Sequence, residues 1–266
     1  MKKFWISLFL LVPVLGTAVF VVAWMKKAWL PENISTLGKE IDLLFYIILA
    51  ITGVIFLFTE GLLVVALAGA RGEDAPKARF FHGNNLMEFT WTVLTAAMLI
   101  FIALYQIPIW AKAKYASHRP NKDPDALVTA SQFMWQVRYP LWDEQSGRPH
   151  KLDTRNPDVM RSFELINELH VPAGEPILIH LTTRDVIHSF WLPKARVKQD
   201  ALPGHLIPVW FDAQKPGTYE WVCAELCGWG HYRMRAKLFV HEKAEFEKWL
   251  QEKSREFLST KQALVR

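Results

Sequence analysis

The sequence predicts a membrane anchor of apolar α-helices followed by a small, mostly β domain that ends in a helix. Long uncharged runs fall before about residue 111, whereas the rest of the chain has mixed polarity. The 266 residues are 51% hydrophobic, which is too apolar for a disordered chain. The chain has only 2 cysteines, which excludes a disulfide-rich scaffold, a four-cysteine zinc site and an iron–sulfur site.

The first apolar run covers residues 4–24 and has lysines on both sides. Its length of about 20 residues fits a helix that crosses a bilayer. A cleaved secretory signal peptide is the competing interpretation, because it also has a basic start and an apolar stretch. No small-x-small cleavage site ends the run, which favours a retained helix. Residues 1–40 are therefore assigned to this helix or signal peptide and to the linker that follows.

Two further apolar runs, residues 43–70 and 89–111, are long enough to span a bilayer and are joined by a short polar segment. They predict an antiparallel helical hairpin over residues 41–111. Positive residues at the N-terminus and in the connecting segment place both on the inner side of the membrane. The residues concerned are Lys2, Lys3, Arg71, Lys77 and Arg79. The remaining domain, residues 112–266, is then expected on the outer, periplasmic side of a bacterial-type cytoplasmic or inner membrane.

Two carboxylates lie in or beside these runs, where charges are costly and raise a functional hypothesis. Glu60 lies inside the second run, and contact with a partner or with the nearby membrane surface is the simpler interpretation. Glu88 directly precedes the third run. Its position alone indicates an acid at a helix start, where the helix dipole favours negative charge.

Short β-branched or aromatic runs separated by Pro-Gly and Gly-rich turns occupy the outer domain, a pattern typical of a small antiparallel sandwich or barrel. The runs are residues 176–183, 206–213, 218–222 and 236–241. Residues 242–257 place Phe246, Trp249 and Leu250 at helical spacing among charges, which predicts an amphipathic helix on the domain. From residue 111 onward, 23 Lys and Arg stand against 19 Asp and Glu, without the basic stripe that nucleic-acid binding requires.

Both cysteines lie in one short stretch, in which Cys223 and Cys227 are followed by His231 and Met234. Thiolate, imidazole and thioether groups are ligands that copper prefers. A mononuclear blue copper site needs two His, one Cys and a weak Met, whereas the second Cys here lets two thiolates bridge two coppers. That arrangement needs one more strong ligand, and His188, which follows a predicted strand, is the best candidate.

Two other interpretations of the cysteines stay open from the residues alone. A disulfide between Cys223 and Cys227 suits an extracytoplasmic domain. A thiol redox pair suits the spacing less well, because such pairs commonly use C-x-x-C. The combination of both cysteines with His188, His231 and Met234 favours copper.

Several motifs together identify a family. Residues 185–190 read Asp-Val-Ile-His-Ser-Phe, residues 198–204 read Lys-Gln-Asp-Ala-Leu-Pro-Gly, and residues 223–228 read Cys-Ala-Glu-Leu-Cys-Gly. Residues 167–172, Asn-Glu-Leu-His-Val-Pro, and residues 88–92, Glu-Phe-Thr-Trp-Thr, belong to the same set. With these motifs the chain resembles subunit II of the haem–copper cytochrome c oxidases over nearly its whole length.

The resemblance implies a cupredoxin-like Greek-key sandwich that holds a binuclear copper centre called Cu(A). The implied copper ligands are His188, Cys223, Cys227, His231, Met234 and the backbone carbonyl of Glu225. The Glu225 carboxylate is further implied as a ligand of a magnesium ion at the interface with subunit I. Glu88 matches the family's carboxylate at the mouth of the proton path called the K channel.

The resemblance also implies a function within an aerobic respiratory terminal oxidase. The partners are a haem-bearing subunit I, other oxidase subunits, membrane lipid and a soluble electron donor, cytochrome c or a similar protein. Cu(A) passes the electrons to haem in subunit I, where O2 is reduced to water with coupled proton translocation. This chain alone is not expected to reduce O2. It is also not expected to carry covalent haem, because no cysteine follows Cys227.

One departure from the family concerns the place where electrons arrive. Phe133 stands where many members have a Trp, while Trp135 of the same segment is kept. Both are candidates for the contact with the donor. The excess of positive residues in the outer domain argues for a donor other than a basic cytochrome c, such as a less basic cytochrome or a small copper protein.

The main alternative is a membrane-anchored copper-binding assembly chaperone. Such chaperones resemble this chain in having C-x-x-x-C, a distant His and a membrane anchor. They have a thioredoxin-like fold and no Met three residues after a loop His. A quinol oxidase subunit II would share the fold but lack the copper ligands, and a nitrous oxide reductase needs a large further domain.

Overall fold

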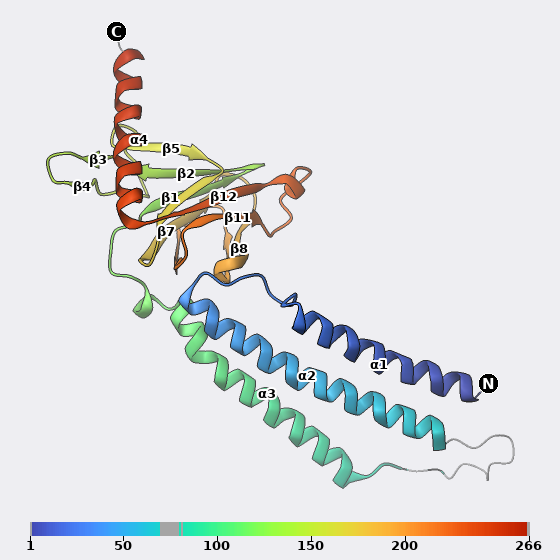
Figure 1. Ribbon diagram of the computed structural model, residues 1–266. Helices are drawn as coiled ribbons and strands as arrows, with labels where there is room; N and C mark the ends of the chain where they lie inside the picture. Colours follow the sequence, from blue (N-terminus) through green and yellow to red (C-terminus); the bar gives the residue numbers. More distant parts are fainter. Residues whose placement is uncertain (1, 70–79, 81, 265–266) are drawn as a thin grey trace. The chain divides into compact units, whose positions relative to one another are not determined.

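The computed structural model describes residues 2–69, 80 and 82–264, and in it three helices precede a β domain (Figure 1). The helices are α1 (Lys2–Met25), α2 (Thr36–Gly69) and α3 (Asn85–Lys114). Each is long and apolar enough to cross a membrane, with mean hydropathies of 2.6, 2.6 and 2.0. The three predicted apolar helices are thus confirmed, while retention of the first one, as opposed to its cleavage as a signal peptide, stays a prediction. The predicted basic connection with Arg71, Lys77 and Arg79 lies outside the described residues.

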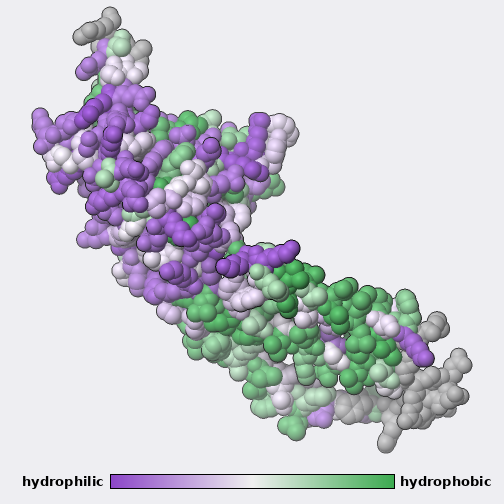
Figure 2. Space-filling view, viewed as in Figure 1, coloured by the Kyte–Doolittle hydropathy of each residue, from purple (hydrophilic) through white to green (hydrophobic). Residues whose placement is uncertain are grey.

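Helices α2 and α3 both begin before the predicted apolar runs, because polar caps define their starts. The Gly38 N–H donates to Ser35 Oγ at 2.9 Å at the start of α2. The Met87 N–H donates to Asn84 Oδ1 at 3.1 Å at the start of α3. Side-chain oxygens at these positions satisfy backbone donors that the helix itself leaves free. On the visible face, apolar residues cover the helices, whereas the β domain is mainly hydrophilic (Figure 2).

The chain divides into two compact units, and the segment just before and at the start of α2 belongs to the unit of the β domain. One unit contains residues 1–31 and 42–108, and the other contains residues 32–41 and 109–266. Ile34 is buried in the core of the second unit. Ser35 Oγ donates to the Ala195 carbonyl at 3.0 Å, and the Thr36 N–H donates to both carboxylate oxygens of Asp212 at 3.1 Å. Asp212 therefore places a negative charge at the start of α2, where the helix dipole favours it.

The β domain is a sandwich of two five-stranded sheets with a small two-stranded sheet beside it. The first sheet has the order β10 (Ile207–Asp212), β7 (Pro176–Thr183), β1 (Ala126–Ser131), β2 (Met134–Pro140) and β5 (Ser162–Ile166). The second has the order β6 (Glu168–Pro172), β12 (Arg235–His241), β11 (Gly217–Cys223), β8 (His188–Leu192) and β9 (Val197–Ala201). The short pair is β3 (Trp142–Asp143) with β4 (Arg148–Pro149).

The predicted β sandwich with a C-terminal helix is confirmed, but its sheets are not purely antiparallel. β1 pairs with β7 in parallel, and β6 pairs with β12 in parallel. Parallel neighbours require long connections rather than hairpin turns, so the Pro-Gly turn pattern that predicted the strands carried no sign of them. These long connections join the two sheets into one sandwich.

Aromatic side chains fill the space between the sheets. Trp135 and Trp221 are fully buried, with ring centroids 4.6 Å apart, and Phe190 lies 4.6 Å from Trp221. Helix α4 (Lys243–Leu264) closes one side of the domain. As predicted, it packs Phe246, Trp249 and Leu250 on the core, and it continues beyond the predicted end at residue 257.

Candidate metal centre

Three segments of the second sheet bring the predicted copper ligands together. His188 begins β8, Cys223 ends β11, and the loop from Ala224 to Met234 leads into β12. The Cys223 N–H donates to the Met234 carbonyl at 3.0 Å, which closes the base of this loop. The Ala224 N–H donates to the Ser189 carbonyl at 3.0 Å and ties the loop to β8. We call residues 223–234 the ligand loop.

The side chains of five predicted ligands meet at one place. Cys223 Sγ lies 3.8 Å from His188 Nδ1 and 3.9 Å from Cys227 Sγ. Cys227 Sγ lies 3.6 Å from His231 Nδ1 and 3.9 Å from Met234 Sδ. The sixth predicted donor, the Glu225 carbonyl oxygen, lies 3.2 Å from Cys223 Sγ. His188, Cys223, Cys227 and Met234 are buried, so the cluster belongs to the interior of the domain.

The two cysteines are free thiols, and their spacing fits shared metal ligation. Their sulfurs are 3.9 Å apart, whereas a disulfide bond is about 2.05 Å long. A metal–thiolate bond is about 2.3 Å long. Both sulfurs could therefore bind the same ion, and the remaining donors of the cluster could bind a second one. The donor set of three sulfurs, two imidazoles and one carbonyl fits a pair of soft metal ions.

The charges of the thiols support the same interpretation. Burial raises the pKa of the Cys223 thiol, but hydrogen bonds with His188 and with neighbouring backbone groups outweigh it and lower the pKa to about 6. Burial and the negative charge of Cys223 both raise the pKa of the Cys227 thiol. Two thiolates this close repel each other unless a cation lies between them.

A carboxylate fixes the orientation of the histidine from β8. His188 Nε2 lies 2.8 Å from Asp185 Oδ1, while its other ring nitrogen faces Cys223 Sγ. The Asp185 carboxylate is itself held, because the backbone N–H groups of Gln132 and Val186 donate to it at 2.7 Å each. Such partners set the tautomer and the direction of a metal-binding imidazole. Sequence reasoning missed Asp185 as a functional residue, although it begins the motif that contains His188.

Two glycines let the first sheet approach the ligand loop closely. The Phe133 ring lies against the backbone of Gly228 and Gly230, and a Cβ at Gly228 would lie only 3.2 Å from it. Gly228 also has a φ of 130°, which favours glycine. Gln132 Nε2 donates to the Cys227 carbonyl at 2.6 Å. Gln132 and Phe133, which directly precede β2, therefore pack against the ligand loop.

The two residues predicted to contact the electron donor, Trp135 and Phe133, are buried to different extents. Trp135 is fully buried, and its ring centroid lies 6.1 Å from that of His188. Phe133 is half-buried under the ligand loop. The large apolar and aromatic side chains that the ligand loop exposes are Leu226, Trp229 and Tyr232, at 78%, 78% and 68% exposure. None of these three residues was predicted as a site residue, although all three lie between predicted copper ligands in the sequence.

Two other predicted site residues are not members of this cluster of side chains. The carboxylate of Glu225 is exposed on the ligand loop, next to the backbone carbonyl that faces Cys223. Glu88 lies in the first turn of α3, exposed, and belongs to the other unit of the chain. Among the described residues, no hydrogen bond joins either carboxylate to the cluster.

The fold and the site together define a class: a membrane-anchored β sandwich with a buried cysteine, histidine and methionine cluster suited to a soft metal. Residues 127–239 match the family described as cytochrome c oxidase subunit II, periplasmic domain. Residues 22–109 match the transmembrane domain of the same subunit. The chain belongs to the cytochrome c oxidase subunit II family.

Two sequence relatives agree with this assignment. Cytochrome c oxidase subunit 2 of Thermostichus vulcanus is 33% identical over 83% of this chain and 77% of its own length. The alternative cytochrome c oxidase subunit 2 of Bradyrhizobium diazoefficiens is 29% identical over 98% of this chain and 96% of its own length. The solved periplasmic domain of subunit II from Bradyrhizobium japonicum is 33% identical, covering 52% of this chain and 98% of that one, with a TM-score of 0.40. Family membership implies an oxidase complex with subunit I as partner.

Proposed function

We propose that this chain is the Cu(A)-bearing, electron-accepting subunit of a respiratory terminal oxidase. The observation that carries the proposal is the convergence of two free thiols, two imidazoles, a thioether and a carbonyl in one buried cluster. His188, Cys223, Glu225, Cys227, His231 and Met234 would hold two copper ions. Bound copper would supply a one-electron carrier between a soluble donor and the haem of subunit I, where O2 is reduced with coupled proton translocation.

The protein's own residues would prepare the site for that task. Asp185 orients His188, and Gln132 and Phe133 support the ligand loop. The buried aromatic rings around Trp135 exclude water and limit movement of the ligands. A rigid site of this kind lowers the reorganisation that accompanies a change of charge, because the surroundings are already arranged.

The remaining assignments belong to the same proposal. The exposed side chains of Leu226, Trp229 and Tyr232 provide a surface through which a donor, cytochrome c or a similar protein, could reach the loop. The Glu225 carboxylate would bind magnesium at the interface with subunit I, and Glu88 would lie at the inner mouth of a proton path. This arrangement has the β domain in the periplasm.

The chaperone alternative is not favoured. It resembles this chain in its cysteine spacing and its distant His, but it has a thioredoxin-like fold. The β domain here is a sandwich of two five-stranded sheets, and Met234 lies 3.9 Å from Cys227 as a further sulfur donor.

The test is paramagnetic resonance of the full chain loaded with copper. We expect a purple protein with two coppers per chain and one unpaired electron shared by two copper nuclei. Cys223→Ser or Cys227→Ser should each abolish that signal, because the proposed centre needs both thiolates to share one electron between two coppers. Met160→Leu, a change at an exposed methionine, is the matched control and should keep it. A four-line mononuclear signal from the unaltered chain would exclude Cu(A).

A further inference from the structure

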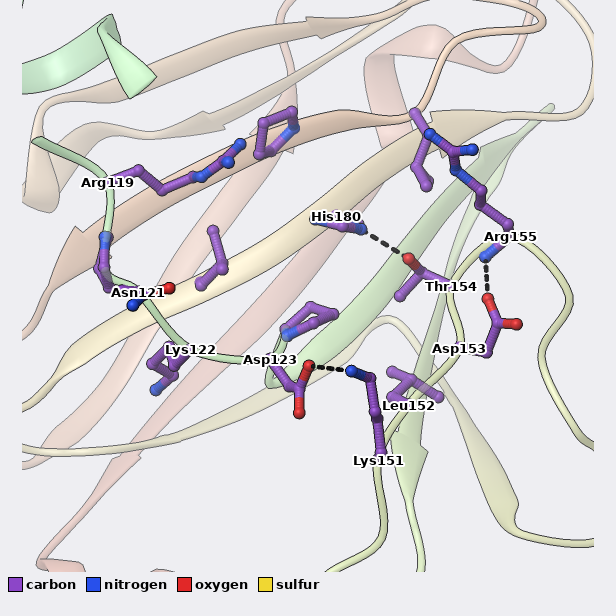
Figure 3. A pocket seen from close by; sticks show the side chains of 15 residues that line it. Arg119, Asn121, Lys122, Asp123, Lys151, Leu152, Asp153, Thr154, Arg155 and His180 are labelled. Carbon is purple, nitrogen blue, oxygen red and sulfur yellow. Dashed lines mark hydrogen bonds and ion pairs between the residues drawn. The ribbon is translucent and has the colours of Figure 1, made fainter. Parts of the chain in front are cut away.

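A pocket of about 830 Å³ lies in the β domain and contains none of the predicted copper ligands (Figure 3). One wall is the segment that follows α3, from Arg119 to Pro124, and another is the segment from Lys151 to Arg155. His180 of β7 lies between them, as the close view shows. All of these residues belong to the same compact unit.

Cations surround this pocket, and two of them are not neutralised. Lys122 pairs with Asp125 at 2.7 Å, and Lys151 pairs with Asp123 at 3.0 Å. Within the part of the chain that the structure describes, the guanidinium groups of Arg119 and Arg155 make no hydrogen bond and no ion pair. Guanidinium groups bind phosphate and carboxylate oxygens through two parallel hydrogen bonds. Two free ones at a concave site therefore indicate an anion.

The pKa of His180 indicates that the positive charges of both guanidinium groups reach the same side chain. Burial lowers the pKa of His180, and the positive charges of Arg119 and Arg155 lower it further. Thr154 Oγ1 lies 2.6 Å from His180 Nδ1, so this ring has a fixed partner and its other nitrogen is left for a ligand. An anion between the two arginines would face the hydroxyl and the imidazole as well.

The nearby carboxylates offer little opposition to an anion. Asp123 is occupied by Lys151. Asp153 accepts hydrogen bonds from the backbone N–H groups of Arg155 and Asn156, at 2.9 and 3.2 Å. These bonds, together with the positive charges of Arg155 and Lys151, lower the pKa of Asp153, so its carboxylate is ionised and already has partners of its own.

We propose that this pocket binds the phosphate group of a small anionic ligand through Arg119 and Arg155. Phosphate is favoured over a single carboxylate because it offers three oxygens and up to two charges to two separate guanidinium groups. The buried side chains of Leu152 and Leu178 form an apolar floor beneath them, which suits an organic phosphate.

The phosphate could come from two sources. One is a soluble phosphate compound, and the other is the headgroup of an anionic phospholipid. Arg119 follows Lys114, the last residue of α3, by only five residues. An extended chain of that length spans at most about 17 Å, so the membrane surface is within reach of this arginine. The inference does not depend on copper, and it can fail while the proposed function stands.

The experiment uses the full chain in nanodiscs and inorganic pyrophosphate as the probe, measured by calorimetry at constant ionic strength. In phosphatidylcholine nanodiscs we expect saturable binding. Arg119→Gln and Arg155→Gln should each weaken it at least tenfold, and the double variant should abolish it. Arg161→Gln changes an exposed arginine outside the pocket and is the matched control. Arg119→Lys keeps the charge and should retain part of the binding, which separates lost charge from lost structure.

A second arm separates the two sources. If phosphatidylglycerol in the nanodiscs weakens pyrophosphate binding, and the Arg119→Gln and Arg155→Gln double variant no longer responds to the lipid, the headgroup is the ligand. If the lipid has no effect, the ligand is a soluble phosphate. Absence of saturable binding in phosphatidylcholine, or equal weakening by Arg161→Gln, would overturn the proposal. Loss of binding after assembly with subunit I would also overturn it, because a partner's acidic side chain would then fill the pocket.

Discussion

Two buried histidines in the same sheet have opposite electrostatic surroundings. His188 begins β8 and His170 lies in β6, and the strands β11 and β12 lie between them in the sheet order. Burial alone lowers the pKa of an imidazole. At His188, hydrogen bonds with the Cys223 thiol and the Asp185 carboxylate outweigh burial and raise the pKa. At His170, burial together with the nearby His241 and Lys253 lowers the pKa to about 3.

These opposite pKa shifts indicate which of the two regions is suited to a cation. Around His188 the neighbours are anionic or soft donors, so a positive ion is stabilised there. Around His170 the neighbours are aromatic rings, a second imidazole, an ammonium group and one carboxylate, Glu168, at 3.5 Å, and burial outweighs the attraction of that carboxylate. Trp249 of α4 stacks on His170 with ring centroids 4.1 Å apart, and His241 Nε2 lies 2.8 Å from His170 Nδ1. His170 therefore stays neutral and serves packing.

The largest effect is expected from Asp185, which gives the His188 region its orientation. Asp185→Ala removes the acceptor of His188 Nε2, and loss of such a partner costs about 10- to 100-fold in metal affinity. Asp185→Asn keeps an acceptor oxygen without the charge and should have a smaller effect. Copper affinity of the full chain by competition with a chelator measures both. Asp143→Ala removes a similar turn-capping carboxylate far along the chain from any ligand and should have no effect. Equal affinities for all variants would remove Asp185 from the site.

The His170 region should instead make stability depend on pH. His170 has a folded pKa near 3, whereas an unfolded histidine has about 6.5. Between these values the unfolded chain binds a proton that the folded chain excludes. Stability is therefore full above pH 6.5 and falls as the pH drops below it. The loss at pH 5 is about 2 kcal/mol, because the pH lies about 1.5 units below the unfolded pKa.

Replacing this histidine tests the assignment. His170→Phe should reduce the pH dependence of the urea midpoint of the metal-free full chain between pH 7 and pH 5, and His180 and His241, whose pKa values burial also lowers, account for the rest. His241, Glu168 and Lys253 also face His170, and they remain in the variant. His205→Phe changes an exposed histidine and should leave the slope unchanged. An unaltered slope in His170→Phe would assign the pH dependence to another group.

The sequence predicted the copper cluster more completely than it predicted the sheets. Cys223, Cys227, His231 and Met234 are close in sequence, so their meeting follows from one loop. The strands β7, β10, β11 and β12 were predicted within about one residue because β-branched runs end at Pro-Gly turns. The strands β1, β2, β5, β6, β8 and β9 were not among the predicted runs. The parallel pairing of β1 with β7 and of β6 with β12 depends on contacts between distant segments, which local patterns do not contain.

Asp185 and Trp229 show the same limit at the level of single residues. The contact between Asp185 and His188 depends on how the turn before β8 folds, and the sequence shows only their spacing of three. Likewise, exposure of Trp229 depends on Phe133 filling the space beneath the glycines of the ligand loop. A large aromatic residue is more often buried than exposed, so the pattern alone gave no reason to place it on the surface.

The two regions also differ in the burial of the tryptophan beside each histidine. This difference gives the prediction with the smallest expected effect. Trp249 over His170 is packed into the core, whereas Trp229 beside His231 is 78% exposed, with the Arg233 guanidinium 5.4 Å from its ring. Exposed aromatic residues contribute strongly to contacts between proteins. Trp229→Ala should therefore slow electron delivery from the soluble donor about tenfold, equivalent to about 1.4 kcal/mol. Its effect on folding stability should stay within about 0.5 kcal/mol, because the side chain is exposed.

Reduction kinetics of the assembled oxidase at several donor concentrations measure the change, with Tyr115→Ala as the control at another exposed aromatic residue. An unchanged rate together with a weakened association with subunit I would assign the Trp229 surface to the partner subunit instead of the donor.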